Sequence, residues 1–166
     1  FFYSVGLDFK DLSYFSSMDK LRELWLGLGY SDNRIISSYG FDLLPVSLED
    51  IVLNGLENTE SLDFSRFSEL QSVYICHSSI KKVSVNNENL DYLNLSDNKF
   101  LTSIIIGEKT EKLKKIVAMD SPNIQIDADE LKKITSLKYL CISKGLLSEN
   151  DIEKLADSGI EVDEET

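Results

Sequence analysis

The chain has 166 residues, of which 42% are hydrophobic and 28% are charged, and its formal net charge is −12. This length and composition fit one folded domain and exclude a disordered or low-complexity chain. The acidic balance argues against direct binding to nucleic acid or to an anionic membrane, because such binding depends on Lys and Arg. The chain also lacks the roughly 18 consecutive apolar residues that a membrane-spanning helix needs, so we expect a soluble protein. Because the sequence begins with Phe1 and not with Met, we expect a piece of a longer protein.

A short pattern recurs along the chain. It is clearest in LDYLNLSDNKF, from Leu90 to Phe100, which has apolar residues at its first, fourth and sixth positions and Asn98 at its ninth. The same frame starts at Phe2, Leu21, Leu48, Leu70, Leu90, Leu113 and Leu137, with gaps of 19 to 27 residues. In the six frames from Leu21 onward these positions are all apolar: Leu21/Leu24/Leu26, Leu48/Ile51/Leu53, Leu70/Val73/Ile75, Leu90/Leu93/Leu95, Leu113/Ile116/Ala118 and Leu137/Leu140/Ile142. The first frame is weaker and reads Phe2/Val5/Leu7.

The frame predicts a short strand in each repeat, with its apolar residues turned inward and the residues between them on the opposite face. The ninth position then turns the chain, and a buried Asn there satisfies backbone groups of the turn. Only Asn98 matches; the equivalent residues are Lys10, Gly29, Leu56, Ser78, Ser121 and Gly145. We therefore expect an irregular stack of repeats without a regular Asn ladder.

The segments between the predicted strands differ from repeat to repeat. The longest, from Gly27 to Ser47, contains Ser, Asn, Gly and Pro and predicts an irregular, mobile loop. Ser84–Val85 and Ser103–Ile106 are expected to be extended. Apolar spacing of three to four residues predicts a short helix over 127–134.

Residues 148–166 predict a C-terminal cap. Ser148 and Asp151 resemble a capping box, Gly159 ends the predicted helix, and a final strand is expected from Ile160 to Val162. Eight acidic residues and one Lys lie in this segment, which we interpret either as a solvated, acidic end or as a surface that attracts basic proteins.

The sequence offers little for catalysis or metal binding. The only histidine is His77, and its neighbour Cys76 would point to the opposite side of an extended strand, so a thiol–imidazole pair is not expected. Cys76 and Cys141 lack metal-site spacing. We predict no catalytic residue, no metal and no cofactor. Reduced thiols favour an intracellular location, cytoplasmic or nuclear, and leave a secreted microbial protein as the alternative.

The LxxLxLxxNxF window and its repetition resemble the leucine-rich repeat family over residues 2–162. The resemblance implies an α/β fold, a right-handed solenoid with a concave parallel β-sheet and irregular or helical convex returns. Residues 1–166 would then form a single domain of about seven repeats. Members of this family act mostly as protein-binding scaffolds, among them ubiquitin-ligase adaptors and microbial effector or surface proteins.

The concave face of such a sheet is expected to carry exposed aromatic residues. The residues predicted there as a partner-binding surface are Trp25, Val52, Tyr74, Tyr92, Asn94, Val117 and Tyr139. Aromatic residues are enriched at binding hot spots. The leading hypothesis is therefore a protein–protein interaction module that recruits another protein, or another domain of the same parent chain, and takes no small-molecule substrate. The alternative is a structural spacer or packing platform in a larger chain, whose aromatic residues stabilise the sheet or are covered by a neighbouring domain.

Overall fold

The computed structural model describes residues 1–4, 11–27 and 36–165. Val5, Gly6, Leu7 and Lys10 of the first predicted frame lie outside the described residues, as does Gly29. Residues 28–35, the centre of the long return predicted to be mobile, lie outside them as well.

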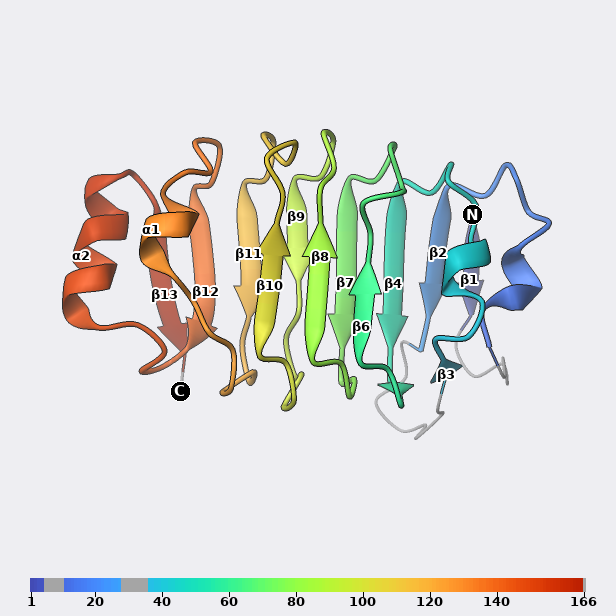
Figure 1. The fold of residues 1–166 in the computed structure, drawn as a ribbon, viewed down its shortest axis with the longest axis horizontal. Coiled ribbons are helices and arrows are strands. Elements are labelled where there is room, and N and C mark those ends of the chain that lie inside the picture. The colour runs from blue at the N-terminus through green and yellow to red at the C-terminus, as the bar shows by residue number, and fades with distance from the viewer. Residues whose placement is uncertain (5–10, 28–35, 166) are drawn as a thin grey trace.

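The larger sheet has eight parallel strands that follow one another in chain order (Figure 1). They are β1 (Phe2–Ser4), β2 (Glu23–Leu26), β4 (Asp50–Asn54), β7 (Ser72–Cys76), β9 (Tyr92–Asn94), β11 (Lys115–Ala118), β12 (Tyr139–Ser143) and β13 (Glu161–Glu165). Each of the frames from Leu21 onward gives one strand at the expected place. The fold is thus a mixed α/β structure dominated by parallel strands.

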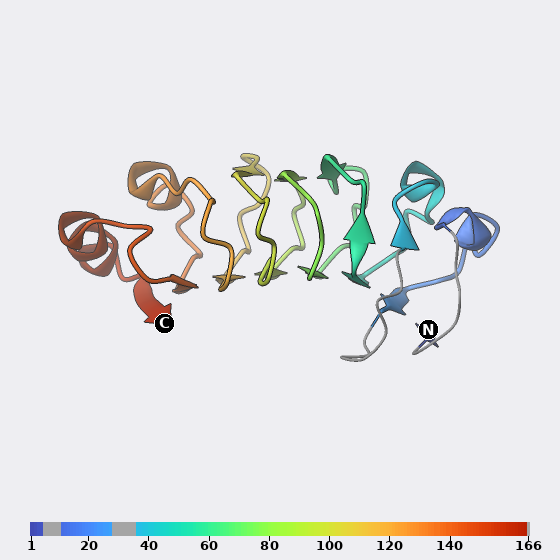
Figure 2. The same ribbon diagram turned by 90° about the horizontal axis from the view of Figure 1, so that it is seen from below.

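The returning segments form a second layer. Its centre is a parallel three-stranded sheet, in the order β10 (Ser103–Ile106), β8 (Lys82–Val85) and β6 (Ser61–Asp63). The helices flank it: the 3₁₀-helices η1 (Ser13–Phe15) and η2 (Phe41–Leu43), α1 (Ala128–Leu131) and α2 (Glu149–Asp157). A two-stranded sheet of β3 (Ile36–Ser37) and β5 (Leu56–Glu57) runs between the two layers (Figure 2). Figure 2 shows the two layers edge-on, with the eight-stranded sheet on one side and the helices on the other.

The first frame was placed three residues too late. In β1, Phe2 lies opposite Leu24 and Tyr3 lies opposite Trp25, whereas the sequence had assigned the position opposite Leu24 to Val5. Phe2 packs edge-on against the buried Phe15, with ring centroids 5.0 Å apart. A large aromatic ring fills the inward position, and the weak apolar pattern of this frame gave no means of choosing between the two registers.

The core lies between the two layers. The eighteen inward positions predicted from Leu21 onward are all buried, and the most exposed of them, Leu21, has an exposed fraction of only 7%. The second layer adds Phe41, Phe64 and Phe67, whose rings pack against one another at centroid distances of 5.1 to 6.2 Å. Burying one such side chain contributes about 1.5–3 kcal/mol, and burial here requires a neighbouring repeat on each side.

A buried row of polar side chains links the turns that follow the central strands. Asn98 is fully buried; its Nδ2 donates to the carbonyls of Ile75 and Leu95 at 2.6 and 2.8 Å, and its Oδ1 accepts from the Ser78 amide at 3.0 Å. The Ser121 hydroxyl accepts from the Asn98 amide at 3.1 Å. The Ser78 hydroxyl in turn accepts from the Leu56 amide at 3.0 Å. The predicted role of Asn98 is therefore present, and serines extend the row where no second asparagine exists.

The residue before each member of this row has a positive φ angle. His77, Asp97 and Asp120 have φ values of 52°, 59° and 50°, and Gly55, before Leu56, has 75°. This backbone conformation turns the chain out of the strand, and Asp adopts it more readily than most residues that carry a side chain. The turn is thus reproduced in four successive repeats by different residues.

A second polar row, which the sequence did not reveal, lies in the turns that follow the strands of the three-stranded sheet. Asn87 is buried, and its Nδ2 donates to the carbonyls of Phe64 and Phe67 at 2.8 and 2.9 Å. The Asn87 amide donates to the hydroxyl of the buried Thr110 at 3.2 Å. This row satisfies backbone groups that the aromatic core would otherwise leave without partners.

The C-terminal cap forms as predicted, with one difference. The Ser148 hydroxyl caps α2 by accepting from the Asp151 amide, and Gly159, with a φ of 79°, follows the helix. The final strand, however, runs over Glu161–Glu165 and pairs along its length with β12. The acidic residues at the end of the chain, within Glu161–Glu165, therefore belong to the last strand of the sheet. The short helix predicted over 127–134 is present as α1, but it spans only Ala128–Leu131. The side chain of Asp127 caps this helix by accepting from the amides of Asp129 and Glu130.

Among the described helices, none combines the length and apolar character needed to cross a membrane.

Replacing Asn98 with Ala removes a side chain that satisfies three buried backbone groups. The Leu95 carbonyl would keep the Ser121 hydroxyl as a partner, whereas the Ile75 carbonyl and the Ser78 amide would lose theirs. We expect Asn98→Ala to lower the free energy of unfolding by at least about 2 kcal/mol, because each unsatisfied buried group costs about 1–3 kcal/mol. Asn123→Ala is the matched control, since Asn123 is exposed and, among the described residues, its side chain donates only to the Lys99 carbonyl; its cost should be about 1 kcal/mol or less. Urea unfolding followed by circular dichroism measures both. Equal losses would contradict the structural role of Asn98.

Candidate interaction surface

Two rows of residues face away from the second layer. In register from strand to strand, the first row is Glu23, Asp50, Ser72, Tyr92, Lys115, Tyr139 and Glu161, and the second is Tyr3, Trp25, Val52, Tyr74, Asn94, Val117, Cys141 and Asp163. All seven residues predicted as the binding surface belong to these rows. No described helix or strand covers this side of the sheet (Figure 2), which we call the open face.

A tyrosine cluster occupies the middle of the open face, and we define it as Tyr74, Tyr92, Lys115 and Tyr139. The rings of Tyr74 and Tyr92 lie 4.9 Å apart, and Lys115 Nζ lies 4.4 Å from the ring centroid of Tyr139 and 5.8 Å from that of Tyr92. All four side chains are partly exposed. The cluster joins four successive strands through ring contacts and cation–π contacts.

Hydrogen bonding and burial perturb the phenols of this cluster. Tyr139 Oη donates to Asp163 Oδ2 at 2.8 Å, and this bond is the main reason that the pKa of Tyr139 is raised to about 12. Burial, followed by the neighbouring Tyr92, raises the pKa of Tyr74. Both tyrosines therefore stay neutral at physiological pH and keep a phenolic O–H group.

A second aromatic group lies at the N-terminal end of the open face. Trp25 is partly buried beneath Phe1 and Tyr3, with ring centroids 6.1 and 6.0 Å away. Phe1 and Tyr3 keep 72% and 49% of their surface exposed. The sequence frame missed both residues because it placed Ser4 and Gly6 on this face. Trp25 Nε1 is buried and has no hydrogen-bond partner among the described residues.

Two residues expected to be exposed on this face, Val52 and Val117, are buried, and so is Cys141 in the same row. Val52, Val117 and Cys141 have exposed fractions of only 6%, 5% and 4%. Val52 lies between Trp25 and Tyr74 in the same row, and these larger side chains shield it. The prediction that Val52 and Val117 present apolar surface to water was therefore wrong, because short side chains in the middle of a sheet are covered by longer neighbours.

Asn94 is held in place by local hydrogen bonds. Its Oδ1 accepts from the Ser96 amide at 3.0 Å and from the Cys76 thiol at 3.6 Å. Burial raises the pKa of Cys76 to about 11, so this thiol stays protonated at neutral pH. His77 turns away from Cys76, and its Nε2 lies 3.6 Å from Asp97 Oδ2. Cys76 and His77 thus have separate partners, and His77, with a φ of 52°, lies in the turn after β7 and not on the strand where the sequence placed it.

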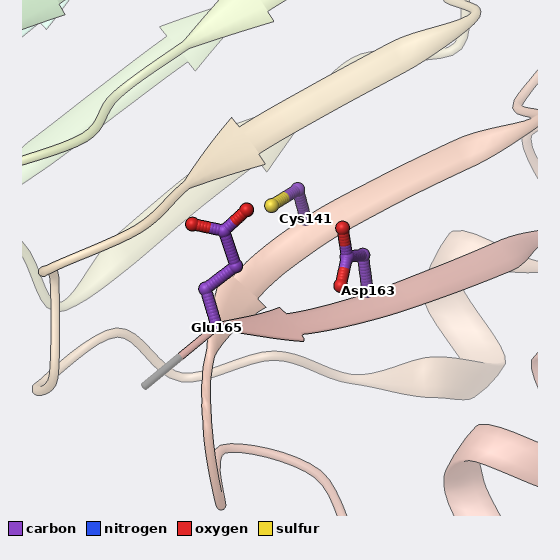
Figure 3. A group of neighbouring side chains, drawn as sticks. All are labelled: Cys141, Asp163 and Glu165. Carbon is purple, nitrogen blue, oxygen red and sulfur yellow. The ribbon is translucent and has the colours of Figure 1, made fainter.

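The C-terminal end of the open face is acidic. Cys141 Sγ and carboxylate oxygens of Asp163 and Glu165 all lie within 4.8 Å of one another (Figure 3). These three groups are the ones that come nearest to a metal site in the described chain, and structural zinc sites use four protein ligands. Burial first, then the two carboxylates, raises the pKa of Cys141, which disfavours the thiolate. The sequence could not indicate this group because β12 and β13 bring it together.

No protein-family model matches the chain, and no curated protein matches it significantly in sequence.

The hydrogen bond between Tyr139 and Asp163 can be tested by titration. Because the raised pKa of Tyr139 depends first on Asp163, we expect Asp163→Ala to lower that pKa markedly, back toward the ordinary value of 10.0. The measurement is an ultraviolet titration of tyrosinate, with Tyr139→Phe identifying the signal. Glu161→Ala removes another nearby carboxylate that makes no hydrogen bond to Tyr139, and it should change the pKa less. An unchanged titration in Asp163→Ala would contradict this hydrogen bond.

Proposed function

We propose that the protein is a leucine-rich repeat solenoid that binds another protein through its open face. The repeated frame, the parallel strands in chain order and the turn row around Asn98 support the architectural part of this proposal. The right-handed winding and the membership of the leucine-rich repeat family belong to the proposal as well.

The observation that carries the functional proposal is the uncovered tyrosine cluster. Parallel sheets are usually covered on both faces, whereas one face of this sheet carries partly exposed aromatic rings and no described element over them. Tyrosines offer a large contact area with few rotatable bonds, and their O–H groups supply hydrogen bonds at an interface. Tyr74, Tyr92 and Tyr139 would form the centre of the contact, with Trp25 at one side and Asn94 between them.

The charge of the open face favours a basic partner. Glu23, Asp50, Glu161 and Asp163 lie in the two rows, against the single cation Lys115. An apolar partner surface with flanking Lys or Arg residues would match both the aromatic centre and the acidic ends. Such charge complementarity would speed association and make it sensitive to salt.

The structural spacer is the second candidate, and one observation favours it. The aromatic residues pack against one another, as in Tyr74 with Tyr92 and Trp25 with Phe1 and Tyr3, and such cross-strand pairs stabilise a sheet without any partner. In that case a neighbouring domain of the parent protein would cover the open face.

Site-specific photo-crosslinking distinguishes binding of a separate protein from the structural spacer. A photoreactive phenylalanine analogue in place of Tyr92 samples the open face, and the same analogue in place of the exposed Lys82 samples the second layer. We expect a discrete adduct with one partner from position 92 and none from position 82. High salt should lower the yield of this adduct.

The binding energy should depend on the tyrosine cluster. We expect the Tyr74→Ala/Tyr92→Ala double variant to weaken partner binding by about a hundredfold or more, since each hot-spot aromatic residue contributes about 2 kcal/mol and neighbouring residues are not fully additive. Lys82→Ala/Lys99→Ala is the matched double variant at exposed positions. Thermal unfolding of both variants checks that the fold is kept. Capture that is equal in both would contradict the assignment of the open face and support the spacer.

A further inference from the structure

The three-stranded sheet of the second layer ends abruptly at β10. The next repeat begins to pair with it, since Gln125 forms a single parallel bridge with Ser103 and its amide donates to the Thr102 carbonyl at 3.0 Å. Two residues later Asp127 caps α1, and the chain leaves the strand direction. Along Ile104–Ile106 no strand of the described chain pairs with this side of β10.

A cavity of about 870 Å³ opens where that strand would lie, between β10 and α1. Figure 1 shows β10 and α1 as neighbours in the second layer. The floor of the cavity consists of buried residues of β11 and β12, such as Ile116 and Leu140. Ile104 and Ile106 line one wall, and Ile134 lines the other. These three isoleucines are only partly buried, so the cavity exposes apolar surface.

The edge of β10 offers backbone hydrogen-bonding groups beside this cavity. Ser103 and Gly107 donate to the carbonyls of Lys81 and Val85, on the β8 side. Successive residues of a strand direct their backbone groups to alternate sides, so those of Ile104 and Ile106 point away from β8. Gln125 covers the Ile104 amide through its bridge to Ser103, which leaves the Ile104 carbonyl and both backbone groups of Ile106 on the cavity side. Such an edge is a template for an added strand.

The rim of the cavity is acidic. Glu108, Glu111, Asp127 and Glu130 line it, and Lys133 is the only base among the lining residues. Lys133 pairs with Glu130, and Asp127 caps α1. The carboxylates of Glu108 and Glu111 are exposed and make no ion pair or hydrogen bond within the described residues, so they remain available to an external cation.

We infer that this cavity binds an extended peptide segment of another protein, which adds a strand to β10, inserts alternate apolar side chains beside Ile104 and Ile106, and pairs Lys or Arg residues with Glu108 and Glu111. The free backbone edge favours a peptide over a small apolar molecule. The unpaired carboxylates favour a basic peptide over an acidic one. This second binding surface lies in the opposite layer from the open face and is independent of its function.

The test uses the 166-residue protein and a capped peptide of about eight residues in which Ile alternates with Lys and Thr. Nuclear magnetic resonance follows the backbone amides during titration. We expect saturable shifts at Ile104–Gly107 and at least about tenfold slower hydrogen exchange at the Ile106 amide. A peptide with the same side chains but N-methylated on alternate backbone nitrogens should bind at least about tenfold more weakly, because it cannot form the ladder.

Charge reversal of the exposed rim residues tests whether their carboxylates pair with Lys or Arg residues of the peptide. Glu108→Lys/Glu111→Lys should weaken binding of the Lys-containing peptide about five- to twentyfold at low salt. The same variant should improve binding of a peptide in which Glu replaces each Lys. Glu57→Lys/Glu69→Lys makes the same change in net charge in the N-terminal half and should leave the affinity within about twofold.

Four results would overturn the inference: no saturable shift up to about 1 mM peptide, shifts confined to the open face, equal binding of the N-methylated peptide, or equal weakening in both charge variants. Equal binding of the N-methylated peptide would indicate a cavity that takes apolar groups without strand addition.

Discussion

The architecture depends on a constraint that acts at each turn: backbone groups buried between successive repeats must find partners. Ser78, Asn98 and Ser121 supply these partners and connect each turn to the next. In four successive repeats the row member follows the open-face residue of its strand by four positions, as in Tyr74 and Ser78 or Asn94 and Asn98. This fixed distance locks the register, because a slip of one residue would bury polar groups without partners and turn leucines outward.

The register in turn creates the open face. The returns between strands vary in length and carry strands, 3₁₀-helices or α-helices, so differences in repeat length are absorbed in the second layer. The sheet stays aligned, so Tyr74 and Tyr92 lie on neighbouring strands, and Tyr139 follows one strand further on, across Lys115. The same variability leaves a defect in the second layer, where α1 replaces the strand that would have paired with β10.

From Leu21 onward, periodic apolar residues were enough to predict six strands of the larger sheet, their inward positions and the residues between them on the open face, because alternation along a strand dictates which side chains are buried. Other features depend on contacts that no single repeat encodes. The exposure of Val52 and Val117 is set by longer neighbours on adjacent strands. The roles of Phe2 and Tyr3 depend on packing against Phe15 and Trp25. The cavity beside β10 exists because Asp127 starts a helix in the one repeat where a strand would have closed it.

A fixed register brings the tyrosines of separate repeats together on the open face, and cross-strand nuclear Overhauser effects between backbone protons test this register most directly. We expect contacts that connect Tyr74 with Asn94 and Tyr92 with Lys115, together with contacts between the rings of Tyr74 and Tyr92. Contacts that pair Tyr74 with Leu93 or Leu95 instead would indicate a register shifted by one residue and would contradict this arrangement of the sheet.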